Sequence, residues 1–399
     1  MKLKALVAAG LMLALCGAAR AEDSTQGITD TSIKIGELGP YSGPYSIFSP
    51  LNYGAIAYLR YINDQGGVNG RKFDIDMADS ACNETTGIAA AKKLISQDQV
   101  FMIMSQPCSG VALAIKPMLV QTGTPWIGIS ADPKISRPPV PGIFHTTYTG
   151  IESGQAMASF ALSKPGVTKI AMVAHSNDWA KGYCDPASDY VKSHGGQVVA
   201  DTKLERGATD ATTQVLQIKA SGAQAVMACL YQPEFITFMR AMQRFNVDAI
   251  VMTGLGVDFD QVLTAIPDHS YLKQRFFQPY QFKAKLGQGP LKKFHDIFVK
   301  YLTKNELPKD GVPTNFYYFG VPAAIVTVEG FRLAGPHPTR DSWEKAIESL
   351  HGFDTGVLAD TETFGPDKHV GVSKMFAVGL NDQGQETVYK SWDDALPEQ

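Results

Sequence analysis

The sequence predicts an α/β protein of two lobes, each built on a parallel sheet with helices on both faces. The first observation is an alternation of strand-like and helix-like runs between residues 33 and 129. The second is that the alternation begins again near residue 148 and continues to residue 253. Such alternation is typical of parallel sheets, in which each helix connects one strand to the next. The third is the length of 399 residues, which exceeds what one core usually supports.

The first 21 residues have the layout of a secretory leader. A basic start, Met1-Lys2-Leu3-Lys4, precedes an apolar run over residues 5–19 and an A-x-A cleavage motif at Ala19-Arg20-Ala21. The apolar run is too short to span a bilayer. We therefore expect a signal peptide at 1–21 and an exported, soluble product. The mature chain would have 378 residues, because 21 of the 399 are removed.

Composition and charge indicate a globular protein that does not bind polyanions. Hydrophobic residues make up 44% of the chain and charged residues 19%. The full chain has a net charge of −3 and the leader holds three positive charges and no acid, so the mature chain has a net charge of −6. That charge argues against nucleic acid and anionic membrane surfaces as partners. The histidines lack metal-ligand spacing and no nucleotide-binding glycine motif occurs, so we expect no metal and no other cofactor.

The first lobe is expected to contain four strands with helices between them. The loop Gly39-Pro40-Tyr41-Ser42-Gly43-Pro44 consists of turn-forming residues and separates the first strand from the first helix. That helix ends at Gly66-Gly67, and Asn69-Gly70 provides the turn into the second strand. The apolar periodicity predicts strands at 33–38, 72–78, 100–104 and 125–129, and helices that include 51–62, 89–95 and 111–119.

A second lobe of similar size follows, and the chain ends in helices and two strand-like runs. The same periodicities predict strands at 170–174, 198–204, 225–229 and 250–253, and helices at 152–162, 182–193, 212–220 and 234–245. Beyond residue 276 we expect amphipathic helices at 291–302, 316–333 and 342–350, then strands at 375–380 and 387–392.

The corner Met104-Ser105-Gln106-Pro107-Cys108-Ser109-Gly110 is the first candidate binding site. It joins an apolar strand to a helix, and the start of a helix leaves backbone N–H groups unpaired. Ser109 stands at the expected N-cap, and Gly110 would let a ligand approach the backbone closely. Free donors and the helix dipole attract anions, so we interpret the corner as a carboxylate site. The alternative is an ordinary capped helix that holds no ligand.

The ends of the expected strands indicate a cleft between the lobes. In open α/β sheets, ligands bind beyond the carboxyl ends of the strands. If the two lobes face each other, one cleft receives the strand ends at Leu38, Met104, Ile129, Ala174, Cys229 and Thr253.

Several short motifs follow one another in a specific order along the mature chain. They are Ile33-Lys34-Ile35-Gly36, Gly39-Pro40-Tyr41-Ser42-Gly43-Pro44, Ile62-Asn63, Gly66-Gly67-Val68-Asn69-Gly70-Arg71, Asp79-Ser80-Ala81-Cys82-Asn83, Cys108-Ser109, Tyr231-Gln232-Pro233-Glu234 and Phe364-Gly365-Pro366. Through these motifs the chain resembles the leucine/isoleucine/valine-binding family, which comprises periplasmic solute-binding proteins of branched-chain amino acid type ABC transporters. The resemblance covers nearly the whole mature chain.

The resemblance implies the type I periplasmic binding protein fold, with two Rossmann-like lobes joined by three crossovers and closing by a hinge motion. The lobe limits it suggests are 27–147 and 278–352 for lobe 1, and 148–277 and 353–399 for lobe 2. It also implies a periplasmic monomer that delivers a small molecule to a membrane permease, which pairs with a cytoplasmic ATPase.

The resemblance further implies a disulfide in the first lobe, at the positions of Cys82 and Cys108. Four cysteines remain after cleavage of the leader, an even number in an oxidising compartment. A bridge to Cys108 would fix the backbone of the candidate anion corner. Cys184 follows one second-lobe strand and Cys229 ends another, so a second bridge between them is left open, because sequence does not determine connectivity.

The family's ligand-contacting positions fall on residues of both lobes. An aromatic residue after the first loop matches Phe48, and the serine after the second cysteine, with Pro107 nearby, matches Ser109. A loop with further contacts matches Ser130, Ala131 and Asp132, within one or two residues. In the second lobe the matches are Trp179 and Tyr231. From the sequence we add Tyr148 and Tyr280 as further aromatic walls, and His175, which follows the expected strand end at Ala174. Core packing is the alternative for each aromatic residue, and a structural role for the histidine.

One departure from the family pattern bears on the ligand. Amino-acid binders of this family place an acid, which holds the α-ammonium, where this chain has Leu255. A buried ammonium without a charged partner is strongly disfavoured. We therefore expect a carboxylate ligand without an α-ammonium, and the aromatic residues favour an aryl acid such as a benzoate or phenylpropanoid derivative. If Asp258 or Asp132 replaces the missing acid, the ligand is a branched-chain or aromatic amino acid.

The alternatives to a solute-binding protein are an exported hydrolase and a sensor domain. An exported hydrolase would use Cys108 or Ser109 as nucleophile and His175 as base. A bridge between Cys108 and Cys82 would rule out that thiol, so we do not expect an enzyme. A sensor domain that signals across the membrane would need a second membrane segment, and no later run is apolar enough.

Overall fold

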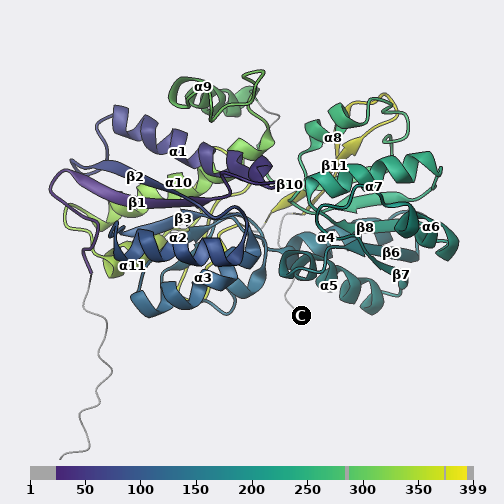
Figure 1. The fold of residues 1–399 in the computed structure, drawn as a ribbon, viewed down its shortest axis with the longest axis horizontal. Coiled ribbons are helices and arrows are strands. Elements are labelled where there is room, and N and C mark those ends of the chain that lie inside the picture. Colours follow the sequence, from purple (N-terminus) through teal and green to yellow (C-terminus); the bar gives the residue numbers. More distant parts are fainter. Residues whose placement is uncertain (1–23, 284–286, 373, 393–399) are drawn as a thin grey trace, which may run out of the picture.

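Two separate sheets organise the chain, and each forms the centre of one lobe (Figure 1). The computed structural model describes residues 24–283, 287–372 and 374–392, so the expected signal peptide at 1–21 lies outside the described residues. The chain passes to the second sheet after β5, returns to the first lobe after β10, and enters the second sheet again at β11. These are the three crossovers of the expected fold.

The first sheet is entirely parallel, with the strand order β2-β1-β3-β4-β5. Its central strand β3 is buried along its whole length, which explains its uninterrupted apolar sequence. The strands are β1 (Ser32–Gly39), β2 (Lys72–Asp79), β3 (Met102–Ser105), β4 (Trp126–Gly128) and β5 (Ile143–His145).

Helices cover both faces of the first sheet. The helices α1 and α10 pack along each other on one face, and α2 packs on α3 on the other (Figure 1). Two glycines permit the close approach of α1 and α10, because a Cβ at Gly54 would overlap the carbonyl oxygen of Tyr317, and one at Gly320 that of Leu51. The helices are α1 (Ser49–Asp64), α2 (Glu84–Ser96), α3 (Ser109–Thr122), α9 (Lys292–Tyr301), α10 (Asn315–Ala334) and α11 (Arg340–Glu348), with 3₁₀ turns η1 (Ser46–Phe48), η2 (Pro133–Ile135) and η3 (Gly289–Leu291).

The second sheet has the order β12-β11-β10-β9-β8-β6-β7 and is not wholly parallel. The strands from β7 to β10 are parallel, whereas β11 pairs antiparallel with both β10 and β12. The second sheet is therefore parallel, as expected, except at this edge, where a hairpin and not a helix joins the last two strands. The strands are β6 (Lys169–Ala174), β7 (Gln197–Lys203), β8 (Ala225–Cys229), β9 (Ile250–Thr253), β10 (Phe276–Tyr280), β11 (Met375–Leu380) and β12 (Glu386–Trp392).

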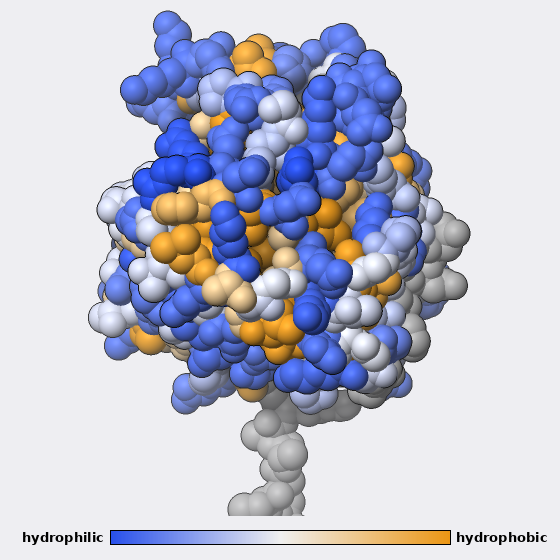
Figure 2. Space-filling view, turned by 90° about the vertical axis from the view of Figure 1, so that its right-hand side faces the viewer, coloured by the Kyte–Doolittle hydropathy of each residue, from blue (hydrophilic) through white to orange (hydrophobic). Residues whose placement is uncertain are grey.

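The second lobe also has helices on both faces of its sheet. The helices α4 (Gly150–Leu162) and α5 (Asp178–Ser193) pack together on one face, and α6 (Thr212–Ser221), α7 (Gln232–Arg244) and α8 (Phe259–Ala265) lie on the other. Figure 2 looks at the outer end of this lobe, where hydrophobic atoms lie among polar ones; Leu216 of α6 is among the exposed apolar side chains. No helix in the described part of the chain is both long and apolar enough to cross a bilayer.

Three regular elements were not expected from the sequence. Strand β5 has three residues, and α8 has seven, so neither gives a clear periodic pattern. Strand β10 contains Pro279, which indicates an edge strand or no strand. The proline is tolerated because β10 pairs with β9 only at Phe276 and Phe277, whereas its later residues pair with β11.

Two stretches lie across the limits suggested for the lobes. All of β10 pairs in the second sheet, through Tyr280, although the suggested limit falls between residues 277 and 278. The stretch around His369 lies beside the first sheet, because its carbonyl oxygen accepts a hydrogen bond from the N–H of His145 in β5. The exact lobe limits stay a prediction.

Disulfides join Cys82 to Cys108 and Cys184 to Cys229, with Cα atoms 5.6 and 6.0 Å apart. The first is the pair that the family resemblance implies. The second, left open by the sequence, joins α5 to the end of β8 inside the second lobe.

Candidate functional site

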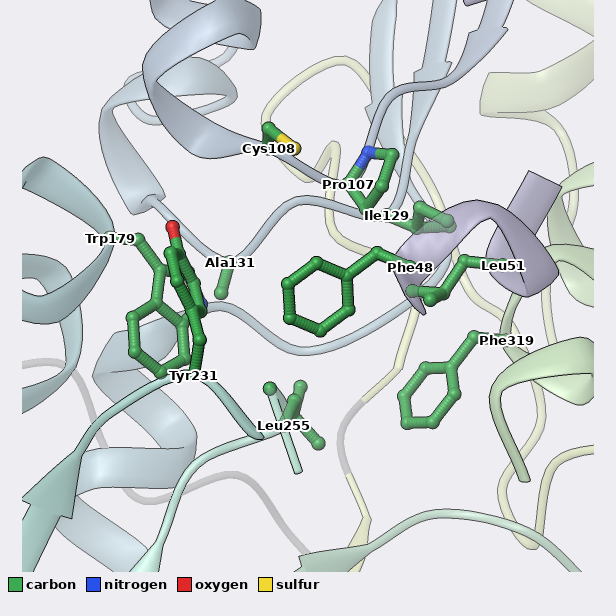
Figure 3. Close-up of a pocket in the computed structure, with 11 residues that line it drawn as sticks. Phe48, Leu51, Pro107, Cys108, Ile129, Ala131, Trp179, Tyr231, Leu255 and Phe319 are labelled. Atoms are coloured by element: carbon green, nitrogen blue, oxygen red, sulfur yellow. The ribbon is translucent and has the colours of Figure 1, made fainter. Parts of the chain in front are cut away.

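A narrow apolar cavity lies between the two lobes, at the carboxyl ends of strands from both sheets (Figure 3). The cavity has a volume of about 450 Å³, including the part open to solvent. Its walls lie close together, because the rings of Phe48 and Tyr231 from opposite lobes have centroids only 5.3 Å apart, and such a shape suits a flat ligand. The cavity is lined by Phe48, Leu51, Pro107, Cys108, Ile129, Ala131, Trp179, Tyr231, Leu255, Gly256 and Phe319.

Aromatic rings from both lobes form the cavity walls. Phe48, at the start of α1, meets Tyr231 edge to face, with ring centroids 5.3 Å apart. Trp179, in the first turn of α5, lies 4.7 Å from Tyr231 on its other side. Figure 3 shows Trp179 and Tyr231 on one side of the cavity and Phe48 and Phe319 on the other. Rings in such positions suit contact with the faces and edges of a planar ligand.

The candidate anion corner forms one end of the cavity, with a different cap from the one expected. Helix α3 begins at Ser109 itself and Cys108 is the N-cap, so the expectation that Ser109 caps the helix is wrong. A Cβ at Gly110 would overlap Oε1 of Glu84, and both residues line a polar pocket next to the cavity. The disulfide to Cys82 nevertheless holds this corner in place.

Several hydrogen-bond donors near this end remain free in the described residues. The N–H groups of Ser109, Gly110 and Val111 have no protein acceptor there, as expected for a helix start. Ser109 Oγ accepts from the N–H of Asp132 at 3.2 Å, which leaves its hydroxyl proton available. Ser130 Oγ is fully buried without a partner, and Ala131 beside it lines the cavity. Such donors can hold a carboxylate.

The cavity lining contains no acidic residue, and each acid proposed as a replacement already caps another element through Oδ1, while its Oδ2 is buried without a partner among the described residues. Asp132 Oδ1 accepts from the N–H of Lys134 and caps a 3₁₀ turn, and burial raises its pKa. Asp258 Oδ1 accepts from the N–H of Gln261 and caps α8, and burial raises its pKa to about 6. Leu255, which we predicted from the family resemblance to stand at the acid's position, points an apolar side chain into the cavity (Figure 3).

A polar pocket adjoins the cavity beyond Cys108 and Tyr231, which line both spaces. Its volume is about 620 Å³, including the part open to solvent, and its charged side chains are Glu84 from the first lobe and Asp178, Lys181 and Arg206 from the second. The Arg206 guanidinium lies 4.0 Å above the ring of Tyr45 in the first lobe. The two lobes are thus in direct contact beside the cavity.

Three further candidates lie outside the apolar cavity. His175 is buried and uses both ring nitrogens within the protein: Nδ1 pairs with the carbonyl oxygen of Leu204 at 2.6 Å, and Nε2 accepts from the N–H of Tyr231 at 2.9 Å. Burial lowers the pKa of this imidazole. Its contacts position Tyr231 and leave no ring nitrogen for a ligand. Tyr148 donates its hydroxyl to the carbonyl oxygen of Tyr280, and Tyr280 itself lines a smaller pocket next to the cavity.

Half of the twelve ligand-binding candidates line the cavity: Phe48, Pro107, Ala131, Trp179, Tyr231 and Leu255. Ser109, Ser130 and Asp132 lie directly beside lining residues, and Tyr148, His175 and Tyr280 are placed as described above. Four further lining residues were not predicted from the sequence as ligand-binding residues: Leu51, Ile129, Gly256 and Phe319. Leu51 and Ile129 lie at expected element ends, but Phe319 belongs to a helix distant in sequence and gave no signal.

No cluster of three or more His, Cys, Asp or Glu side chains that could hold a metal ion occurs in residues 24–283, 287–372 and 374–392. Two facing α/β lobes with a cavity between them, lined from both sides, define a two-lobed small-molecule binding protein. A family model described as periplasmic binding protein matches residues 32–385. The chain therefore belongs to the periplasmic binding protein family.

Relatives and solved structures agree with this membership. The Leu/Ile/Val-binding protein of Escherichia coli strain K12 is 26% identical over 256 residues, which cover 64% of this chain and 67% of that protein. The chain spans about two thirds of the length of the first curated relatives it matches. A branched-chain amino acid ABC transporter protein from Thermus thermophilus with bound valine superposes with a TM-score of 0.82 at 18% identity, covering 92% of this chain and 97% of that one. A solute binding protein from R. palustris in complex with 4-hydroxybenzoate gives 0.78 at 19% identity, covering 92% and 98%.

Proposed function

We propose that this protein is the periplasmic substrate-binding component of an ABC importer and that its substrate is a small aromatic carboxylate. The observation that carries the proposal is a narrow cavity with aromatic walls and no acidic lining residue. A benzoate or a phenylpropanoid acid has the flat ring and the single negative charge that such a cavity accommodates. The solved neighbour that holds 4-hydroxybenzoate supports this class of ligand for the fold.

In this proposal the carboxylate binds at the corner near Cys108. The free N–H groups at the start of α3 and the hydroxyls of Ser109 and Ser130 supply donors, and the helix dipole adds a favourable field. The ring then packs against Phe48 and Tyr231, which belong to different lobes and both line the cavity.

Capture proceeds by closure of the lobes around the substrate. Tyr45 of the first lobe donates a hydrogen bond to Glu234 of the second at 3.4 Å, and Arg206 covers the same tyrosine ring. These cross-lobe contacts exist only when the lobes approach each other. A ligand that touches both lobes therefore shifts the population toward the closed form. The closed form then docks on a membrane permease that pairs with a cytoplasmic ATPase, and we propose that the protein acts as a monomer.

The second candidate is a branched-chain or aromatic amino acid; the relatives named above are described as a Leu/Ile/Val-binding protein and a protein with bound valine. Such a ligand brings an α-ammonium, and Leu255 offers it no charge. Leaving an ion buried without a partner costs several kcal/mol, on the order of 1,000-fold in affinity. The hydrolase alternative has less support, because Cys108 is bridged and the ring nitrogens of His175 are both used.

The experiment compares ligand pairs that differ only in the α-ammonium. Calorimetric titrations of the mature protein with 3-phenylpropanoate against phenylalanine, and with 4-methylpentanoate against leucine, measure the preference directly. We expect micromolar or tighter binding of 3-phenylpropanoate and at least 100-fold weaker binding of phenylalanine. Tight binding of leucine or valine together with no binding of any aromatic acid would overturn the assignment in favour of the second candidate.

A further inference from the structure

A small polar pocket lies directly behind the aromatic cavity. Leu255 and Phe319 line both spaces, so the two spaces adjoin at these side chains. The small pocket has a volume of about 270 Å³. The pocket is lined by Leu255, Val257, Gln278, Pro279, Tyr280, Gln281, Phe282, Asn315 and Phe319.

Amide groups in this pocket lack hydrogen-bond partners. Both Oε1 and Nε2 of Gln281 are buried without a partner, and the residue is 1% exposed. Gln278 Oε1 and Asn315 Oδ1 are also buried and unpaired, on residues that are 5% and 8% exposed. Buried polar groups in proteins are nearly always paired with protein, water or ligand. One unpaired amide and two unpaired amide oxygens around one small space therefore point to a polar group that binds there.

The pocket lies at the opposite end of the cavity from the anion corner. Figure 3 shows Pro107 and Cys108 at the upper end and Leu255 and Phe319 at the lower end, with the ring of Phe48 between them. A ligand whose carboxylate binds near Cys108 would thus direct the far side of its ring toward Leu255. A substituent there would reach the small polar pocket.

We propose that the Gln281 pocket is a subsite for a hydroxyl group on the ring of the substrate, placed para to the carboxylate-bearing position. This inference rests on the proposed function and specifies the substrate class as 4-hydroxyaryl acids. A phenol hydroxyl both donates and accepts, and the Gln281 amide offers the matching acceptor and donor. The pocket draws residues from both lobes, with Asn315 and Phe319 from α10 and Leu255 and Val257 from the second lobe. A hydroxyl bound there would thus help to stabilise the closed form of the two lobes.

The test uses ligand pairs of equal size, in which a hydroxyl is replaced by a methyl group. The mature protein is titrated with 4-hydroxybenzoate against 4-methylbenzoate, and with 3-(4-hydroxyphenyl)propanoate against its 4-methyl analogue. A site built to hydrogen-bond a hydroxyl rejects an analogue without it. We expect at least tenfold tighter binding of the hydroxyl compound in each pair that binds. Equal affinity, or tighter binding of the methyl compound, overturns the inference.

The same titrations with Gln281→Leu assign the preference to this residue. We expect the hydroxyl preference to fall below threefold, with the methyl analogues bound as tightly as by the wild type or more tightly. Gln121→Leu, on the exposed side of α3, is the matched control and should keep the full preference. If Gln281→Leu keeps the preference for hydroxyl compounds, the assignment of this preference to Gln281 is overturned. If the variant does not fold, the titrations of the wild type with the ligand pairs test the inference on their own. Failure of the proposed function would give a different result, because no aromatic acid would then bind, with or without a hydroxyl. That result would overturn the proposed subsite as well.

Discussion

Phe48 of the first lobe and Tyr231 of the second meet edge to face, with ring centroids 5.3 Å apart and an interplanar angle of 69°. Both rings line the cavity, so this contact joins the lobes at the place where we propose the ligand binds. Tyr231 is held in turn by its N–H bond to His175 and by the ring of Trp179 at 4.7 Å. A ring fixed on two sides is preorganised for a ligand, which reduces the entropy cost of binding.

Tyr231→Ala should weaken binding of 3-phenylpropanoate at least tenfold, equal to about 1.4 kcal/mol. The substitution removes a wall of the cavity and the cross-lobe contact with Phe48, but keeps the backbone N–H that His175 accepts from. Calorimetry measures the change. Tyr190→Ala is the matched control, because Tyr190 stacks on His194 at the end of α5 and does not line the cavity. Equal effects of the two variants would contradict the proposed place of the ring.

Leu255→Glu should shift the preference of the site from aryl acids to amino acids. Leu255 lines the cavity at the position where amino-acid binders of the family carry an acid, so a glutamate there could pair with an α-ammonium. We expect phenylalanine to bind at least tenfold more tightly than to the wild type, and 3-phenylpropanoate to bind more weakly because two carboxylates repel.

Leu255→Gln is the neutral control for this change, with the same shape but no charge. It should not gain affinity for phenylalanine. If both variants gain it equally, or if neither does, the absence of an acid at residue 255 is not what excludes amino acids. Thermal-shift and calorimetric titrations of both variants against both ligands give the answer.

The sequence alone predicted most of the fold because its elements carry strong local patterns. Strand β3 is a short apolar run bounded by turn signals, and α1 repeats apolar residues at helical spacing until Gly66. Where local signals are weak, the prediction failed. Strand β10 was not predicted because it contains Pro279. Its register depends on pairing with β11, about one hundred residues later in the chain.

The cavity was predictable only in part, for a related reason. Phe48 and Tyr231 follow recognisable motifs, whereas Phe319 is one apolar residue among many in α10 and reaches the cavity through the packing of α10 on α1. The unpaired amides of Gln278 and Gln281 have no sequence signal at all. Whether a buried amide finds a partner depends on what the folded chain places around it.

The two disulfides should contribute similarly to stability and differently to binding. Each closes a loop, of sequence separation 26 for Cys82–Cys108 and 45 for Cys184–Cys229, worth about 3–4 kcal/mol on the chain-entropy model. Cys108 lines the cavity, whereas neither Cys184 nor Cys229 does. We therefore expect the double variant Cys82→Ser/Cys108→Ser to lose both stability and at least tenfold in affinity.

The double variant Cys184→Ser/Cys229→Ser is the matched control, with a comparable loss of stability. Its affinity for 3-phenylpropanoate should stay within threefold of the wild type. Chemical denaturation and calorimetry measure the two quantities separately. Equal losses of affinity in both variants would show that the first bridge has no special effect on the anion corner.

Glu37 gives the first lobe a dependence on pH that is separate from ligand binding. It is fully buried in β1, where Ser105 donates to one carboxylate oxygen and Asn52 to the other. Burial raises its pKa from 4.5 to about 8, because the charged form loses its hydration. The folded protein therefore keeps this proton between about pH 4.5 and pH 8, whereas the unfolded chain releases it. Its contribution to stability is full below this window and is lost as the pH rises through it.

Glu37→Gln should remove this part of the pH dependence. The amide has the shape of the protonated carboxyl and can pair with Ser105 and Asn52, but it does not titrate. One proton of difference changes the free energy of unfolding by about 1.4 kcal/mol per pH unit, so the window amounts to roughly 4 kcal/mol. Glu362 is another buried carboxyl with a raised pKa, so the informative quantity is the difference in the free energy of unfolding between wild type and variant.

Denaturant unfolding at pH 5 should give nearly equal stabilities for the wild type and Glu37→Gln, and at pH 8 the variant should be the more stable. Asp74→Asn, on the exposed side of β2, should follow the wild type at both values. A variant that tracks the wild type from pH 5 to pH 8 would mean that Glu37 is already ionised in the folded protein at pH 5.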